Sequence, residues 1–266
     1  MNLVGRTALI TGSVQGIGLA IATALAEAGA RIAVHGIATD EQQKDACRKL
    51  IASGAEDARF FPGDLRDPAQ IQALVEAVNA WHPLDVLVNN AGIQKTAALP
   101  DVTEDTWDTI IAVNLSAAFY TMQAAVPGMA ARGYGRVINI ASVHGIVGSK
   151  FKAPYVASKH GLIGLSKVVA LEYASSSDAT KGGVTVNCIC PGFTDTPLVV
   201  PQVQERARLI GKDEAAGVAS LLSEKQPSLR MSNPSEIGAL ALWLCDPIAH
   251  NVTGAAIPID GAWTAQ

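Results

Sequence analysis

The stretch that decides the fold is Thr11-Gly12-Ser13-Val14-Gln15-Gly16-Ile17-Gly18. It joins the apolar run Thr7–Ile10, which predicts a strand, to the alanine-rich segment Gly18–Ala28, which predicts a helix. Glycine allows a tight strand-to-helix turn and lets a pyrophosphate approach main-chain N–H groups at the helix N-terminus. This glycine turn therefore favours a nucleotide site, although any tight turn of this kind also favours glycine.

Outward from the glycine turn, short apolar runs alternate with longer helical segments. The predicted strands are Thr7–Ile10, Arg31–His35, Ala58–Gly63, Asp85–Asn89, Arg136–Ser142, Val184–Cys190 and Ala256–Ile259. The predicted helices are Gly18–Ala28, Asp40–Ala52, Pro68–Trp81, Thr106–Met129 and Tyr155–Tyr173. This alternation predicts an α/β fold, a doubly wound parallel sheet of the Rossmann type with helices on both faces.

Two segments interrupt the alternation. The stretch Phe193–Asn233 is polar, punctuated by proline and long for a connection, so we expect it to act as a lid over a substrate. The Ser- and Gly-rich stretch Ala174–Gly183 is expected to form a surface loop. No linker or shift of composition divides the chain, and residues 1–266 are therefore predicted to form one domain.

The composition excludes several classes of protein. Hydrophobic residues make up 49% of the chain and charged residues 17%, and the net charge is −4, so a nucleic-acid partner is not expected. The four cysteines form no C-x-x-C pair, which predicts buried thiols and no metal site. No uninterrupted apolar run of about 18 residues predicts a membrane span. No signal-like segment is apparent within Met1–Ile10, and we expect a cytoplasmic protein without a membrane partner.

Further short motifs follow the glycine turn in a fixed order. They are Asp64, Asn89-Asn90-Ala91-Gly92, Asn114, Ser142, Tyr155-x-x-x-Lys159, Pro191-Gly192 and Thr196. Each motif is moderate evidence alone, but their order and spacing extend over the whole chain. The sequence thereby resembles the short-chain dehydrogenase/reductase family, which implies oxidoreduction with a nicotinamide cofactor.

The family resemblance implies a cofactor site assembled from several loops. Its residues are Thr11, Gly12, Ser13, Gln15, Gly16, Ile17, Gly18, Asp64, Leu65, Asn90, Ala91, Gly92, Tyr155, Lys159, Pro191, Gly192 and Thr196. An acid at the end of the second strand would bind the 2′-hydroxyl of NAD, whereas an arginine there would favour NADP. The chain has His35-Gly36-Ile37-Ala38 at this place, and Gln15 where relatives that use NADP often have a basic residue. Because a phosphate anchor is absent, we expect NAD.

The catalytic residues implied by the resemblance are Asn114, Ser142, Tyr155 and Lys159. Tyr155 and Lys159 are four residues apart on a predicted helix, so they share one face. An unperturbed tyrosine has a pKa of about 10. A neighbouring ammonium and a positive nicotinamide ring are expected to lower it. Ser142 ends a predicted strand and can hold the substrate oxygen, and the resemblance gives Asn114 a water that relays protons from Lys159. Taken singly, each residue also has an ordinary structural explanation.

Four segments resemble the D-3-hydroxybutyrate dehydrogenase branch of the family. They are Asn89–Ser116, residues 138–165, Ser223–Arg230 and residues 260–266. The likeness implies reversible oxidation of (R)-3-hydroxybutyrate to acetoacetate by a homotetramer. The substrate-binding residues that it implies are Gln94, Ser142, His144, Lys152, Tyr155 and Gln202. Lys152 would supply a point charge for the carboxylate, and the glutamines and His144 would supply hydrogen-bond donors.

Three departures and three alternatives remain open. Phe193 stands where close relatives have tryptophan, Asp195 has no explanation, and the loop Ser175–Gly183 is longer than expected. Trp263 resembles the family's C-terminal tryptophan, which is expected to reach a neighbouring subunit's pocket. The alternatives are a 3-oxoacyl thioester reductase, another short-chain alcohol dehydrogenase and a cofactor-sensing binding protein. A thioester reductase would favour a basic cofactor anchor, and a sensor would be expected to lack Tyr155 or Lys159.

Overall fold

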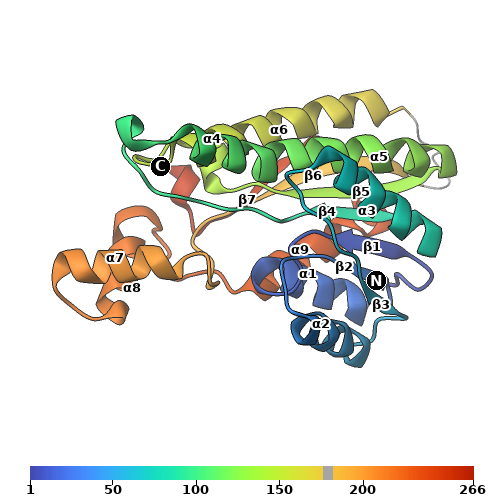
Figure 1. The fold of residues 1–266 in the computed structure, drawn as a ribbon, viewed down its shortest axis with the longest axis horizontal. Coiled ribbons are helices and arrows are strands. Elements are labelled where there is room, and N and C mark those ends of the chain that lie inside the picture. The colour runs from blue at the N-terminus through green and yellow to red at the C-terminus, as the bar shows by residue number, and fades with distance from the viewer. Residues whose placement is uncertain (176–181) are drawn as a thin grey trace.

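Helices cover both faces of one parallel sheet (Figure 1). The computed structural model describes residues 1–175 and 182–266, so the predicted loop Ala174–Gly183 lies largely outside the described residues. Its strands are β1 (Thr7–Ile10), β2 (Arg31–Val34), β3 (Ala58–Phe60), β4 (Val86–Asn89), β5 (Tyr134–Ile140), β6 (Gly183–Pro191) and β7 (Ala256–Ile259). They pair in parallel in the order β3-β2-β1-β4-β5-β6-β7, which confirms the predicted doubly wound sheet.

The helices form two layers, one on each face of this sheet. They are α1 (Gly16–Glu27), α2 (Asp40–Ala52), α3 (Pro68–Trp81), α4 (Glu104–Ile111), α5 (Ala117–Arg132), α6 (Ala153–Tyr173), α7 (Val200–Ile210), α8 (Glu214–Lys225) and α9 (Pro234–Leu244). Leu9 and Leu87 point into the core beneath α3, α5 and α6, whereas Ile10 and Val88 point into the core beneath α1, α2 and α9. Because both faces are covered, the strands are apolar almost throughout.

Three of these helices are absent from the sequence prediction. The signals for α9 were present, because Asn233 and Glu236 form a capping box and Pro234 occupies the first turn. Helices α7 and α8 lie inside the predicted lid Phe193–Asn233. Their sequences look like loop because each buries only a few residues, Val203 and Ala207 in α7 and Gly217 and Leu222 in α8.

The predicted helix Thr106–Met129 is interrupted by a π-helical segment, Ala112–Ser116, between α4 and α5. The whole stretch Glu104–Arg132 is long and apolar enough to cross a membrane by length and composition, although 44% of its most apolar window is buried. Ala118, Met122 and Val126 of this stretch belong to the core beneath the sheet. Its apolar character therefore serves packing within the fold.

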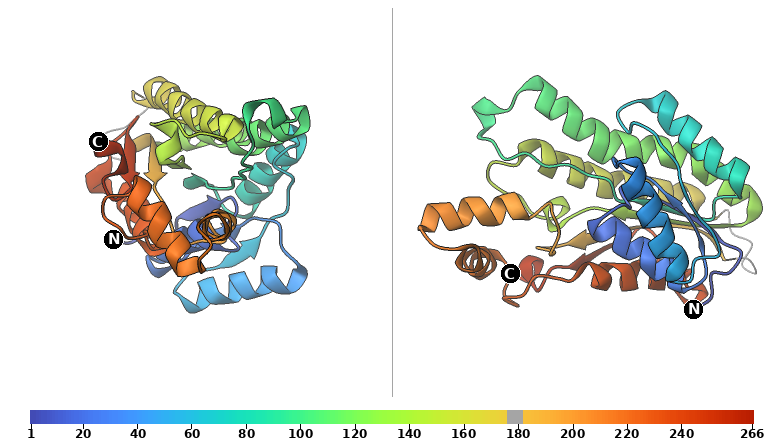
Figure 2. Two further views of the ribbon diagram at one scale, coloured as in Figure 1. Left: turned by 90° about the vertical axis from the view of Figure 1, so that its left-hand side faces the viewer. Right: turned by 60° about the horizontal axis from the view of Figure 1, so that its bottom comes forward.

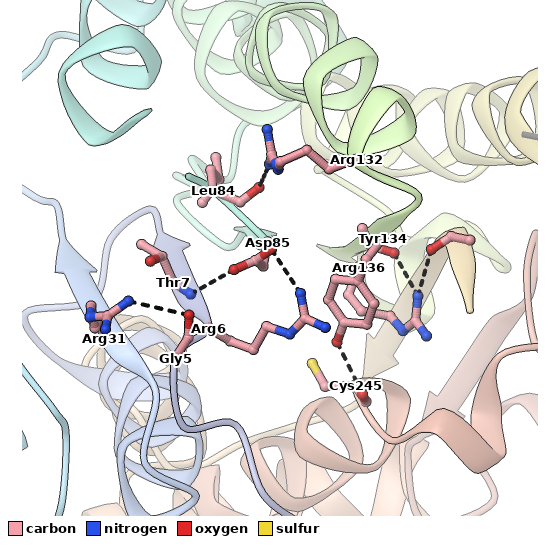
Figure 3. Close-up of polar contacts among 12 residues, drawn as sticks. Gly5, Arg6, Thr7, Arg31, Leu84, Asp85, Arg132, Tyr134, Arg136 and Cys245 are labelled. Carbon is pink, nitrogen blue, oxygen red and sulfur yellow. Dashed lines mark hydrogen bonds and ion pairs between the residues drawn. The ribbon is translucent and has the colours of Figure 1, made fainter. Parts of the chain in front are cut away.

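The amino ends of the strands are closed by charged and aromatic side chains (Figure 3). Arg6 forms an ion pair with Asp85 at 3.1 Å. Arg136 is 1% exposed and donates from Nη1 to the carbonyl oxygen of Gly183 at 2.9 Å. The Tyr134 ring lies 3.7 Å from the guanidinium carbon of Arg6 and 4.5 Å from that of Arg136. With this edge filled, the opposite, carboxyl edge is the place for a ligand.

Helices α7 and α8 form a hairpin that stands out from the two helical layers at this carboxyl edge (Figures 1 and 2). A small third core joins the hairpin to the body of the protein. It consists of Val143, Phe193, Val199, Val203, Leu222 and Trp263. The C-terminus lies on the same side of the molecule, and the N-terminus lies at the far end. The predicted lid is thus a helical hairpin on a narrow base.

Candidate active site

The candidate site lies where the strand order reverses. β1 pairs with β2 on one side and with β4 on the other, so the loops that follow β1 and β4 diverge. Such a switch point at the carboxyl edge leaves a crevice for a ligand. The glycine turn follows β1, Asn90–Gly92 follows β4 and Ser142 follows β5. One edge of the sheet therefore carries the residues that the sequence singled out.

Local geometry requires each of the three glycines in the turn. Gly12 and Gly16 have φ angles of +66° and +58°, which L side chains rarely adopt. Gly18 lies within α1, and a β-carbon there would overlap the carbonyl oxygen of Gly12 and the side-chain nitrogen of Asn90. The absence of that side chain lets the start of α1 approach the loop after β4.

Asn90 fastens the glycine turn to β4. Its Nδ2 donates to the carbonyl oxygens of Thr11 and Gly12, at 2.8 and 3.1 Å. In return, the Thr11 hydroxyl accepts hydrogen bonds from the backbone N–H groups of Asn90 and Ala91, both at 3.0 Å. Four of the predicted cofactor residues therefore form one hydrogen-bonded unit.

The N-terminus of α1 fits the pyrophosphate of a dinucleotide. The Gln15 side chain makes no capping hydrogen bond, and the first turn of α1 contains no acidic residue. Its leading N–H groups and the positive end of the helix dipole can therefore meet an anion. Across the turn, a β-carbon on Gly16 would lie 3.6 Å from the Thr196 methyl group. Thr196, one of the predicted cofactor residues, thus borders the same crevice.

His35 braces the glycine turn from the side of β2. It is 3% exposed, its Nδ1 accepts the Gly12 N–H at 3.4 Å, and its Nε2 lies 3.0 Å from the Gly63 carbonyl oxygen. These partners assign a neutral ring that carries its hydrogen on Nε2. Burial lowers the pKa of His35, which favours the same form. The sequence marked His35 only as neither acid nor arginine, and its bracing role depends on residues 23 and 28 positions away.

Asp64 and Leu65 follow β3 at the edge of the sheet, four strands away from β5. A hydrogen bond from the Arg66 side chain, 2.6 Å from Oδ2, and one from the Arg66 backbone lower the pKa of Asp64 to about 2. Leu65 also lines a small cavity together with Asn114 and Lys159, whereas Asp64 is separated from Ser142 by the distance from β3 to β5. That separation fits the opposite, adenine end of an extended dinucleotide.

Ser142, Tyr155 and Lys159 lie together beneath the crevice. Tyr155 and Lys159 are 7% and 3% exposed on one face of α6. A hydrogen bond with Ser142 lowers the pKa of Tyr155, but burial has the larger effect and raises it. Lys159 Nζ lies 5.7 Å from the centre of the Tyr155 ring and donates to the Ile140 carbonyl oxygen at 2.7 Å. The pKa of Tyr155 is thus raised by burial, and Lys159 does not produce the lowering that we predicted. Burial also lowers the pKa of Lys159 to about 8.

The π-helical segment brings Asn114 to the loop after β4. Its Oδ1 accepts the Ile93 N–H and its Nδ2 donates to the Ile93 carbonyl oxygen, both at 2.9 Å. Widened helical turns of this kind occur often at functional sites. A cavity of about 10 Å³ lies beside Asn114 and Lys159. This volume is close to the space that one water requires, at about 10–15 Å³.

The residues predicted to bind a carboxylate lie partly together. Lys152 Nζ donates to Gln202 Oε1 at 2.8 Å, which joins the start of α6 to lid helix α7. Burial lowers the pKa of Lys152 to about 8 and that of His144 to about 4, so His144 is neutral. Within the described residues, His144 Nδ1 is buried without a hydrogen-bond partner. Gln94 is half-buried in the loop after β4, and no hydrogen bond joins it to these three within the described chain.

An aromatic wall borders the same pocket. The Trp263 ring meets His144 edge-on at 5.3 Å and packs against Phe193 at 5.0 Å. His144 in turn lies edge-on to Tyr155 at 6.2 Å. Trp263 therefore contacts the site of its own chain, and its expected reach into a neighbouring subunit's pocket stays a prediction.

Replacing Gly18 by alanine is expected to weaken cofactor binding by at least about tenfold, since the new β-carbon would force α1 away from Asn90. Fluorescence titration with NADH measures this affinity. Gly164→Ala on α6 is the matched control, because a β-carbon there meets open space. Equal NADH affinity in Gly18→Ala and the wild type would show that the close approach is not needed.

Comparison with known proteins places these features in a family. The sequence profile of the short chain dehydrogenases matches residues 6–207. The chain is 45% identical to a D-beta-hydroxybutyrate dehydrogenase of Cupriavidus necator and 42% identical to one of Rhizobium meliloti, each over 98% of this chain and 99% of the relative. The crystal structure of L-sorbose reductase from Gluconobacter frateurii, complexed with NADPH and L-sorbose, has a TM-score of 0.92 and 30% identity and covers 100% of this chain and 99% of its own. The chain therefore belongs to the short-chain dehydrogenase/reductase family.

Proposed function

We propose that this protein catalyses the NAD-dependent, reversible oxidation of (R)-3-hydroxybutyrate to acetoacetate. The observation that carries the proposal is a buried cation beside an alcohol site: Lys152, paired with Gln202, precedes Tyr155 by three residues. Neutral His144 lies between the aromatic wall and Tyr155. A short hydroxy acid presents the two groups that such a pocket can bind. The D-beta-hydroxybutyrate dehydrogenases among the relatives support the same substrate.

Tyr155 serves as the general base toward the substrate hydroxyl. The Ser142 hydroxyl, which is hydrogen-bonded to Tyr155, holds the substrate oxygen against the phenol. A bound nicotinamide ring would supply the acceptor for the hydride from C3 of the substrate, and its positive charge would favour the phenolate. Lys159, whose pKa burial lowers to about 8, is charged at pH 7 and lies 5.7 Å from the centre of the Tyr155 ring. Lys159 releases a proton to a water in the small cavity beside Asn114 and can then accept the proton that Tyr155 took from the substrate.

Lys152 and its neighbours hold the carboxylate. A carboxylate near Nζ replaces water that burial has removed from the ammonium, so it raises the lowered pKa of Lys152 and keeps the charge in place. Neutral His144 can donate one N–H hydrogen bond, and Gln94 and Gln202 supply amide donors. Lys152 fixes the charge of the substrate, and these donors fix its orientation.

The surroundings of β2 support NAD. His35 is neutral and turned toward Gly63, and the exposed residues Gln15 and Ile37 carry no charge. Helix α2 then begins with Asp40 and Glu41. A 2′-phosphate would meet acidic residues at the start of α2 and no cation from the segment His35–Ala38, so the uncharged 2′-hydroxyl of NAD is the better match.

The predicted homotetramer is retained as part of the proposal. Phe119 of α5 and Val168 and Leu171 of α6 expose apolar side chains on the outer helical layer. A second copy of the chain that packed on this layer would remove these side chains from water.

One assay distinguishes the proposed activity from its alternatives. NAD and NADP are each supplied with (R)- and (S)-3-hydroxybutyrate and with longer 3-hydroxy acids, and the reduced cofactors with a 3-oxoacyl thioester. We expect turnover of (R)-3-hydroxybutyrate with NAD, followed by absorbance at about 340 nm. Absence of that turnover would refute the proposal, thioester reduction alone would identify a reductase, and cofactor binding without any turnover would identify a sensor.

Tyr155→Phe is expected to lower kcat by about 10²–10⁴-fold, because the phenol oxygen that takes the proton is lost. The affinity for NADH should change little, since Lys159 and the glycine turn remain. Tyr120→Phe, on the half-buried part of α5, is the control for removal of a phenol elsewhere. Undiminished turnover in Tyr155→Phe would rule out the proton-transfer step.

The KM for (R)-3-hydroxybutyrate is expected to rise above about pH 8, because Lys152 loses its charge there and the carboxylate loses its partner. The uncharged methyl ester serves as a matched substrate, whose KM should not follow this rise. Lys152→Met should raise the KM of the acid by at least about tenfold at pH 7 and abolish the dependence. An identical pH profile for acid and ester would contradict the role of Lys152.

A further inference from the structure

One buried amide joins the two ends of the lid. Gln226 follows α8 and is 1% exposed. Its Oε1 accepts the Phe193 N–H at 2.9 Å, and its Nε2 donates to the Arg230 carbonyl oxygen. Gln226 belongs to the run Ser223–Arg230, to which the proposed reaction assigns no role. Its side chain connects the residue that begins the predicted lid with the segment that ends it.

Backbone pairing reinforces this connection. Thr194 and Ser232 form a parallel bridge. The Ser232 N–H donates to the Phe193 carbonyl oxygen at 2.9 Å, and the Asp195 N–H donates to the Ser232 carbonyl oxygen at 3.0 Å. The chain that leaves β6 and the chain that returns to α9 therefore lie side by side. The Gln226 side chain joins the same two chain segments from the interior of the protein.

The C-terminal turn packs against the same amide. The Ser228 N–H donates to the Gly261 carbonyl oxygen at 3.0 Å. A β-carbon on Gly261 would lie 2.8 Å from Gln226 Cγ, and one on Gly192 would lie 2.7 Å from Gln226 Oε1. Both glycines thus leave room for the Gln226 side chain. Because Trp263 follows Gly261 by two residues, the position of its ring depends on this packing.

We propose that Gln226 is a positioning residue that fixes Phe193 and Trp263 against His144 and thereby shapes the substrate pocket. Gln226 acts through the backbone of Phe193 on one side and through the C-terminal turn on the other. An apolar side chain of similar size would leave the Phe193 N–H buried without a partner, which favours displacement of that residue. The glycine turn shares none of these contacts, whereas Gly192 of the predicted cofactor site packs against Gln226. Loss of Gln226 is therefore expected to weaken substrate binding more than cofactor binding. The identity of the substrate rests on the proposed function.

The test compares Gln226→Leu with the wild-type protein and with Glu224→Gln. Glu224→Gln weakens the ion pair that Glu224 of α8 forms with Arg206 of α7, and it leaves the contacts of Gln226 intact. For Gln226→Leu we expect a KM for (R)-3-hydroxybutyrate raised by about tenfold, which corresponds to loss of one buried hydrogen bond. The affinity for NADH should fall by clearly less than this, because the glycine turn, Asn90 and Lys159 make no contact with Gln226. Gln226→Glu, which keeps an acceptor for the Phe193 N–H, should show a smaller rise in KM.

Hydrogen exchange followed by mass spectrometry gives a readout that needs no substrate. In Gln226→Leu, peptides covering 192–196 and 228–232 should exchange faster than in the wild type, while peptides from the sheet should not. Unchanged exchange at the base, an unchanged KM, or an equal loss of NADH affinity would each overturn the proposal. Absence of wild-type turnover with (R)-3-hydroxybutyrate would refute the proposed function, and the exchange and NADH measurements would still decide whether Gln226 holds the lid.

Discussion

The close approach of Gly18 to Asn90 is the constraint on which the site depends. Because Gly18 has no β-carbon, Asn90 can bond the glycine turn and hold the loop after β4 against β1. Ile93 belongs to that loop. Its backbone N–H and carbonyl oxygen both form hydrogen bonds with the side chain of Asn114, which lies in the π-helical segment. Gly92 precedes Ile93 in this loop, and a β-carbon on Gly92 would lie 3.6 Å from Lys159 Nζ. The glycine turn, Asn114 and Lys159 are therefore positioned by one continuous chain of contacts.

A buried polar network fixes the helices behind the site. Thr121 donates to Asn89, Asn89 to Asn139, and Asn139 to Ser166, at 2.7, 2.9 and 2.7 Å. These residues belong to α5, β4, β5 and α6. A buried network whose groups are mutually satisfied favours one packing arrangement, because any shift leaves a polar atom unpaired. Helix α6, which carries Tyr155, is thereby held in a fixed register to the sheet.

The sequence predicted what depends on local pattern. Strand positions, the order of the layers and the Tyr155–Lys159 face follow from periodicity and spacing, and the fold prediction is confirmed. The π-helical segment could not be predicted, because it depends on pairing of Asn114 with a loop 21 residues away. The pKa of Tyr155 was expected to fall, whereas burial, which depends on tertiary packing, raises it. The contacts of Gln226 could not be predicted from the run Ser223–Arg230, because its partners are 33 and 4 residues distant.

The two halves of the site differ in how they are held, and this difference bears on selectivity. The cofactor half is built on loops that the sheet fixes directly, whereas Gln202 reaches Lys152 from a lid joined to the body by a narrow base. The ammonium group of Lys152 loses most of its hydration when the protein folds. The hydrogen bond to the amide oxygen of Gln202 compensates for this loss only in part. In the proposed reaction the substrate carboxylate supplies the missing charge, and a substrate without one would leave the ammonium poorly paired. A site built in this way rejects the uncharged analogue more strongly than the analogue with an extra methylene, because a desolvated charge costs more than a small apolar misfit.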